Sequence, residues 1–147
     1  SMKSRPYRWR LNMRTGEVRE GYLSDTITEF GMIDQQRVGL PYRYVYSVVP
    51  TRGMFTFDGL IKHDVQTGRE ESLLFGHGVF GSETVVARKP AAVDEDDAWL
   101  ITFTSDVLND KSHCVVYDAK AFGGGPIARI ELPERISSGT HACWAAA

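Results

Sequence analysis

A hairpin-like sequence unit occurs twice in this chain of 147 residues, and it constrains the fold more than any other feature. The segment Trp9–Val18 is typical of strand, turn and strand, and the segment Leu60–Arg69 repeats that pattern. Asn12 and Asp64 occupy the same place in the two copies, and each is followed at the same spacing by a Thr-Gly pair. Asn and Asp side chains hydrogen-bond to the backbone of their own turn, and Gly tolerates the positive φ that such turns need. The chain is therefore predicted to be built from repeated β-hairpins.

A third, less regular copy of the unit follows. Its first strand is Val115–Ala119, with Asp118 in the aligned position, and its second strand is Ile127–Ile130. A longer turn through Gly123–Pro126 separates the two strands. Apolar residues alternate with polar ones along most of the chain, as in Tyr42–Ser47, and no window of helical length shows a 3.6-residue apolar stripe. These patterns predict an all-β fold.

Three ionisable residues follow the hairpins at equivalent places: Glu29, Glu83 and His141. Each is predicted to stand at the start of a short strand, behind a loop that contains Gly or Ser. A repeat of roughly 50 residues with four short strands has the size of a β-propeller blade, whose first strand lines the central channel. We therefore expect the three side chains to converge on the axis. The alternative, that they are ordinary turn and strand-end residues, stays open on spacing alone.

A propeller needs about four to eight blades, and this chain holds fewer than three units. The chain is then part of a larger propeller, or a unit of an oligomer, or a small sandwich that covers its edges differently. We treat residues 5–147 as one all-β domain and interpret Ser1-Met2 as a tag-cleavage remnant.

Charge and apolar patterning narrow the classes of function. The net charge is −2, with 17 basic and 19 acidic residues, which argues against nucleic acid as the main ligand. The apolar runs are too short to span a bilayer, and the N-terminal region has no secretory h-region, so we expect a cytoplasmic location. Cys114 and Cys143 lack metal-ligand spacing and are interpreted as buried thiols of a reducing compartment.

Three ordered motifs resemble the C-terminal third of the carotenoid cleavage oxygenase family, which includes lignostilbene dioxygenases and the retinal-pigment-epithelium isomerase. The first comprises Glu29–Asp34 and Gly39–Tyr46. The second comprises Gly59–Asp64, Phe80–Glu83, Asp94–Asp97, Trp99 and Leu100. The third comprises Leu132–Ile136 and Gly139–Trp144.

This resemblance implies a seven-bladed β-propeller with four-stranded antiparallel blades, of which this chain would form about two and a half to three. It also implies an axial Fe(II) ion that four histidines bind. By position, His141 matches the last iron ligand, and Glu29 and Glu83 match two glutamates that hold iron histidines. Neutral imidazole suits Fe(II), and a carboxylate on the other ring nitrogen fixes the tautomer.

The sequence departs from the family pattern through substitutions within the motifs and through the histidines that it lacks. Gly31 stands where proline is usual, and Thr140 and Ala142 flank the histidine where Phe and Gly are common. The other three iron histidines are absent, because the family supplies them from earlier blades.

The remaining histidines are not expected to replace the missing ligands. His63 and His113 belong to equivalent outer strands of their units, and His77 is expected to be a solvated loop residue. The acidic run Asp94–Asp97 is interpreted as a solvated turn rather than a cation site. Trp99 and the tyrosines of the Tyr42–Tyr46 segment are interpreted as packing residues.

Two functions follow from these observations. The first is the C-terminal portion of a non-haem Fe(II) dioxygenase that cleaves a carbon–carbon double bond of a carotenoid, apocarotenoid or stilbene with O₂. The intact protein could then associate peripherally with a membrane, whereas this chain alone is expected to be inactive and to bind iron weakly. The second is a non-catalytic propeller-derived module that self-associates. In both cases we expect a homo-oligomer through open blade sides near Trp9 and Leu11 and near Val115 and Ile127.

Overall fold

The computed structural model describes residues 3–145, so the proposed tag remnant Ser1-Met2 lies outside the described residues. The strands are β1 (Tyr7–Leu11), β2 (Val18–Tyr22), β3 (Glu29–Met32), β4 (Tyr44–Pro50), β5 (Phe57–Asp64), β6 (Glu70–Leu74), β7 (Val79–Gly81), β8 (Val85–Arg88), β9 (Ala98–Asp106), β10 (Lys111–Asp118) and β11 (Pro126–Glu131). Two single 3₁₀ turns, η1 (Gln35–Arg37) and η2 (Phe122–Gly124), are the only helical pieces in this part of the chain. Within residues 3–145, no helix has the length and apolar character needed to cross a membrane.

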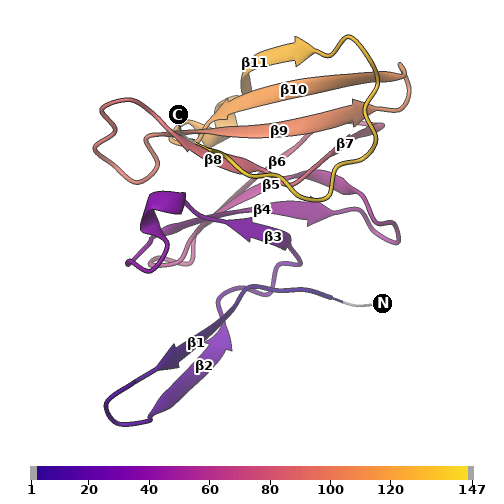
Figure 1. The fold of residues 1–147 in the computed structure, drawn as a ribbon. Helices are drawn as coiled ribbons and strands as arrows, with labels where there is room; N and C mark the ends of the chain where they lie inside the picture. The colour runs from indigo at the N-terminus through magenta and orange to yellow at the C-terminus, as the bar shows by residue number, and fades with distance from the viewer. Residues whose placement is uncertain (1–2, 146–147) are drawn as a thin grey trace.

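The strands form two four-stranded antiparallel blades (Figure 1). The first blade is β3–β4–β5–β6, and the second blade is β8–β9–β10–β11. The short strand β7 pairs with both β5 and β9, and it joins the two blades into one hydrogen-bonded sheet. The hairpin β1–β2 stands apart from this sheet. Two blades and one extra hairpin confirm the prediction of an all-β fold with two and a half to three propeller blades.

The repeated turns have the chemistry that the sequence predicts. In each copy the side-chain oxygen of Asn12 or Asp64 accepts hydrogen bonds from the backbone N–H groups two and three residues later, at 3.0–3.3 Å. Gly16 and Gly68 close these turns with φ values of 75° and 76°. Asp118 accepts one such bond in the third copy, at 2.9 Å. The hairpin repeat is therefore set by local hydrogen bonds that each unit makes within itself.

The apolar core lies between the facing sides of the two blades. Tyr46, Val48 and Leu60 from the first blade pack with Leu100 and Val115 from the second, and each is at most 2% exposed. The packing role expected for the tyrosine segment is thus confirmed for Tyr46. The placement of Val115 on an open side is wrong, because alternate β10 residues face the first blade and Val115 is one of them.

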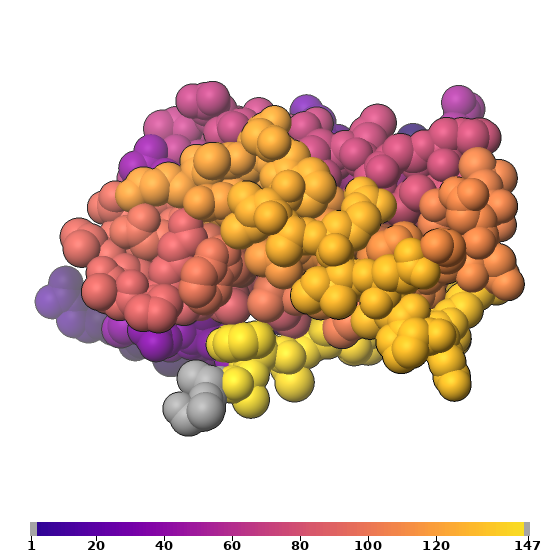
Figure 2. Space-filling model, turned by 90° about the horizontal axis from the view of Figure 1, so that it is seen from above, coloured from indigo at the N-terminus to yellow at the C-terminus, as the bar shows by residue number. Residues whose placement is uncertain are grey.

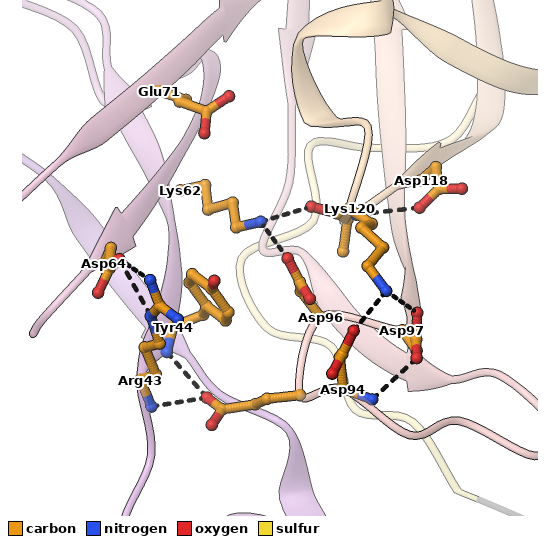
Figure 3. A network of polar contacts seen from close by, with 12 residues as sticks. Arg43, Tyr44, Lys62, Asp64, Glu71, Asp94, Asp96, Asp97, Asp118 and Lys120 are labelled. Atoms are coloured by element: carbon orange, nitrogen blue, oxygen red, sulfur yellow. Dashed lines mark hydrogen bonds and ion pairs between the residues drawn. The ribbon is translucent and has the colours of Figure 1, made fainter.

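A polar clasp also joins the blades (Figure 3). The ammonium of Lys62 is buried, and it donates to a carboxylate oxygen of Asp96 and to the carbonyl of Ala119, both at 2.8 Å. One carboxylate oxygen of Glu95 accepts the backbone N–H groups of Arg43 and Tyr44, each at 2.8 Å.

The acidic run Asp94–Asp97 was expected to be a solvated turn. The structure shows that it also has a role in joining the fold. Asp94 and Asp97 both accept hydrogen bonds from Lys120, and Asp97 also closes the local turn by accepting the backbone N–H of Asp94. The run is built into the fold because its carboxylates satisfy donors from both blades.

Candidate metal-ligand site

The C-terminal segment carries His141 back to the junction of the two blades. After β11 the chain turns away from the sheet and runs back across it toward β8 (Figure 1). The backbone N–H groups of Leu132 and Ile136 donate to the carbonyl and the hydroxyl of Ser112 at 2.8 and 3.1 Å, which fixes the start of this path. Residues 137–145 stay at the surface, and Figure 2 shows this last described part of the chain along one border of the molecule.

His141 does not stand at the start of a strand, and Glu83 lies two residues before β8, so that part of the sequence prediction is wrong for His141 and inexact for Glu83. Within residues 3–145 the segment after β11 pairs with no strand. A strand needs a partner that offers a free ladder of N–H and C=O groups, and this segment is held instead by separate hydrogen bonds of its backbone N–H groups to Ser112 and Glu83.

Glu83 is the main anchor of His141. It lies in the short link between β7 and β8, and its side chain is only 9% exposed. One carboxylate oxygen accepts the backbone N–H of Ala142 at 2.7 Å and lies 3.3 Å from Nδ1 of His141. A carboxylate at Nδ1 favours the tautomer that carries its proton there, so Nε2 keeps a free lone pair. The imidazole is 75% exposed, which leaves Nε2 accessible.

Phe30 contacts the same imidazole from the first blade. The two rings meet edge to face, with centroids 4.9 Å apart and an interplanar angle of 69°. His141 is therefore held between Glu83, next to the second blade, and Phe30, in β3 of the first. Phe30 was not among the predicted site residues, although its position directly after Glu29 was a signal for it.

Glu29 begins β3 and pairs with Val48 of β4. It lines a cavity of about 200 Å³ together with Phe30, Arg5 and Tyr7, among other residues. Among the described residues no hydrogen bond joins Glu29 to Glu83 or His141. The structure thus brings Glu83 and His141 into contact, whereas Glu29 approaches this pair through its neighbour Phe30.

The other histidines lie elsewhere in the fold. His63 in β5 is buried beside Glu70, with its Nδ1 3.0 Å from a carboxylate oxygen, and His113 is buried in the equivalent strand β10. His77 is exposed in the loop before β7. In the part of the chain that the structure describes, no three His, Cys, Asp or Glu residues are grouped so that they could hold a metal ion. The site therefore offers one accessible imidazole and its carboxylate.

The two cysteines are both free thiols, but they differ in burial. Cys114 is partly buried in β10, and burial raises the pKa of its thiol. Cys143 is exposed, so the expectation of a buried thiol is wrong there, because the segment that carries it runs along the surface.

A model of the retinal pigment epithelial membrane protein family matches residues 1–146. The chain belongs to this family. Among curated relatives, it is 35% identical over 150 residues to carotenoid 9,10(9',10')-cleavage dioxygenase 1 of Pisum sativum, covering 92% of this chain and 28% of that protein. It is 31% identical to lignostilbene-alpha,beta-dioxygenase isozyme III of Sphingomonas paucimobilis, covering 97% of this chain and 32% of that protein.

Solved structures agree with these sequence matches. A variant of Synechocystis apocarotenoid oxygenase superposes with a TM-score of 0.87 at 26% identity, over 96% of this chain and 30% of that one. The cobalt-substituted form of the Synechocystis enzyme gives 0.80 at 25% identity, over 90% and 29%. The family resemblance and the propeller architecture are thus confirmed, and this family member spans less than a third of the relatives' length.

Proposed function

We propose that this chain supplies the C-terminal blades of an Fe(II)-dependent dioxygenase that cleaves a carbon–carbon double bond of a carotenoid, apocarotenoid or stilbene with O₂. The observation that carries the proposal is the contact between Glu83 and Nδ1 of His141, at the residues the family motif identifies. The relatives' names support the substrate class, since they describe cleavage of carotenoids, apocarotenoids and lignostilbene.

The residues present fit one corner of an iron site. His141 offers a neutral imidazole with an accessible Nε2, which suits Fe(II), and Glu83 holds the tautomer that this binding requires. The backbone N–H of Ala142 in turn holds the Glu83 carboxylate. Glu29 is proposed to hold another histidine in the same way, from its cavity beside β3. Bound iron would supply the activation of O₂ toward the double bond.

One imidazole with its carboxylate is a poor metal site, so the 147-residue chain alone is expected to bind Fe(II) weakly. Metal analysis of the tag-free chain should find far less than one iron per molecule. A near-stoichiometric iron content would contradict this expectation.

The proposal itself is tested in a chimera. Residues 5–145 replace the matching C-terminal region of Synechocystis apocarotenoid oxygenase, and iron content and cleavage of an apocarotenoid are measured. We expect the chimera to bind iron and cleave, His141→Ala to lose both, and Glu83→Gln to lower both by about 10–100-fold. His77→Ala, at an exposed loop histidine, is the matched control and should change neither. A folded His141→Ala chimera that keeps its iron would overturn the assignment.

Self-association is the second candidate function, and exposed apolar strands favour it. Trp9 and Leu11 in β1 are 62% and 61% exposed, and Ile127 and Ile130 in β11 are 58% and 57% exposed. The outer edge of β11 also carries no ladder partner among the described strands. Exposed apolar surface and an unpaired edge both promote association, so we propose a two-fold dimer. Gel filtration with light scattering measures the oligomeric state, and a monomer of 16.5 kDa at high concentration would contradict the proposed dimer.

A further inference from the structure

The innermost strand of the first blade contains a bulge at Phe30. Glu29 pairs with Val48 and Met32 pairs with Tyr46, so β3 carries one residue more than β4 between these two pairs. Phe30 has a φ of 49°, in the left-handed region that bulky residues rarely adopt. Among the described residues, Ala91 and Asp110 are the remaining non-glycine residues with positive φ, and both lie in turns. A strained bulge inside a strand commonly redirects a side chain, and such strain gathers at functional sites.

The bulge is held against β4. A Cβ added to Gly31 would lie 3.1 Å from a methyl carbon of Val45 and 3.4 Å from the hydroxyl of Ser47. The missing side chain at this position lets the bulged backbone approach β4 closely. The unusual conformation of Phe30 is therefore accompanied by a close approach of its C-terminal neighbour Gly31 to β4.

The redirected ring bridges the core and the candidate ligand. Phe30 packs edge to face on Phe57, with centroids 5.4 Å apart, and Phe57 is a core residue that is 3% exposed. The same ring packs edge to face on His141. The Phe30 ring thus contacts a buried core residue on one side and an imidazole that is 75% exposed on the other.

Glu83 alone does not fix the imidazole. Its carboxylate contacts only Nδ1, and the ring can still rotate about that contact. A ring edge against the imidazole restricts this rotation, because aromatic pairs have preferred geometries. We propose that Phe30 is a positioning residue for His141, and that the β3 bulge aims its ring so that Nε2 keeps one direction. The purpose of this restraint rests on the proposed iron function, but the restraint itself can be measured without metal.

The experiment is nuclear magnetic resonance of the 147-residue chain with labelled histidine, without metal. In the wild type we expect nuclear Overhauser effects between the rings of Phe30 and His141, and an order parameter of the His141 ring close to that of rigid backbone, about 0.85. Phe30→Leu should lower it below about 0.6, the range of flexible groups, and Phe30→Tyr, which keeps the ring, should restore it. Phe55→Leu is the matched control, because Phe55 also packs on Phe57 and is 74% exposed.

The ring of the buried His113 is observed in the same spectra and should stay rigid in every variant, which separates loss of positioning from loss of fold. An unchanged His141 order parameter in folded Phe30→Leu would overturn the proposal, as would a flexible His141 ring in the wild type. Phe30→Met replaces Phe30→Leu if the latter does not fold, and if neither folds the wild-type result decides. Because no iron or substrate is used, failure here is distinct from failure of the chimera to bind iron.

Discussion

Single residues in this chain often satisfy two elements at once, and Asp64 shows the principle. One carboxylate oxygen caps the turn after β5, and the other accepts hydrogen bonds from Nε and Nη2 of Arg43 at 3.0 and 2.7 Å. The Arg43 guanidinium holds the pKa of the Asp64 carboxyl well below its ordinary value of 3.8. The residue thus links the hairpin turn to the start of β4 through a charge.

This link predicts a pH dependence of stability. A carboxyl with a lowered pKa in the folded state stabilises the fold above its unfolded pKa, and that stability is lost progressively as the pH falls below about 4. Arg43→Met should therefore lower the Tm at pH 7, and its difference from the wild type should shrink on acidification to about pH 2. Thermal melts followed by circular dichroism measure this. Arg5→Met, which breaks a pair with the 93% exposed Asp25, should lower the Tm less; an equal loss would contradict the prediction.

At the scale of elements, β5 organises the first blade and the junction. It pairs with β4, β6 and β7, and Gly59 lies in its ladder opposite Val49 and Leu74. A Cβ at Gly59 would run into the backbone carbonyl of Leu73. The glycine is therefore required by the close approach of β6 rather than by its own φ.

Gly59→Ala is expected to destabilise the chain by about 1–3 kcal/mol, because overpacking against backbone cannot be relieved by a side-chain rotation. Urea unfolding gives the free energy. Gly124→Ala is the control, since nothing lies within 4 Å of its added Cβ, and it should change stability by less than about 0.5 kcal/mol. Equal effects of the two substitutions would show that the β5–β6 contact is looser than the structure has it.

At the scale of the molecule, the two blades are joined by a core, by β7 and by the polar clasp. The pair of Lys62 and Asp96 lies within this junction, with side chains 7% and 11% exposed. A buried pair adds little net stability over apolar residues of the same shape, but removing one partner leaves a buried charge alone.

Lys62→Met is therefore expected to cost about 3–5 kcal/mol in unfolding free energy, and adding Asp96→Leu should recover much of that loss. A double-mutant cycle by urea denaturation measures the coupling. Lys111→Met, at the exposed pair with Glu131, should cost at most about 1 kcal/mol. A nearly neutral Lys62→Met would mean that the junction admits water and the clasp is not buried in solution.

Features that depend on neighbouring residues could be predicted from the sequence alone. The turns at Asn12 and Asp64 follow from a side-chain acceptor and a glycine a few residues apart, and the all-β class follows from alternation. The family resemblance pointed to His141 and Glu83, and the structure places a carboxylate oxygen of Glu83 3.3 Å from Nδ1 of His141. The family resemblance also predicted the propeller architecture.

Contacts between residues that are distant in the sequence depend on how the two blades and the C-terminal segment pack. Alternation places a side chain on one of two sheet faces, but it does not say what covers that face. Val115 was therefore expected on an open side although the first blade covers it, and the acidic run Asp94–Asp97 was not recognised as a clasp. Phe30 stands directly after Glu29, but its contact with His141 joins β3 to a segment that is distant in the sequence, so that contact could not be predicted.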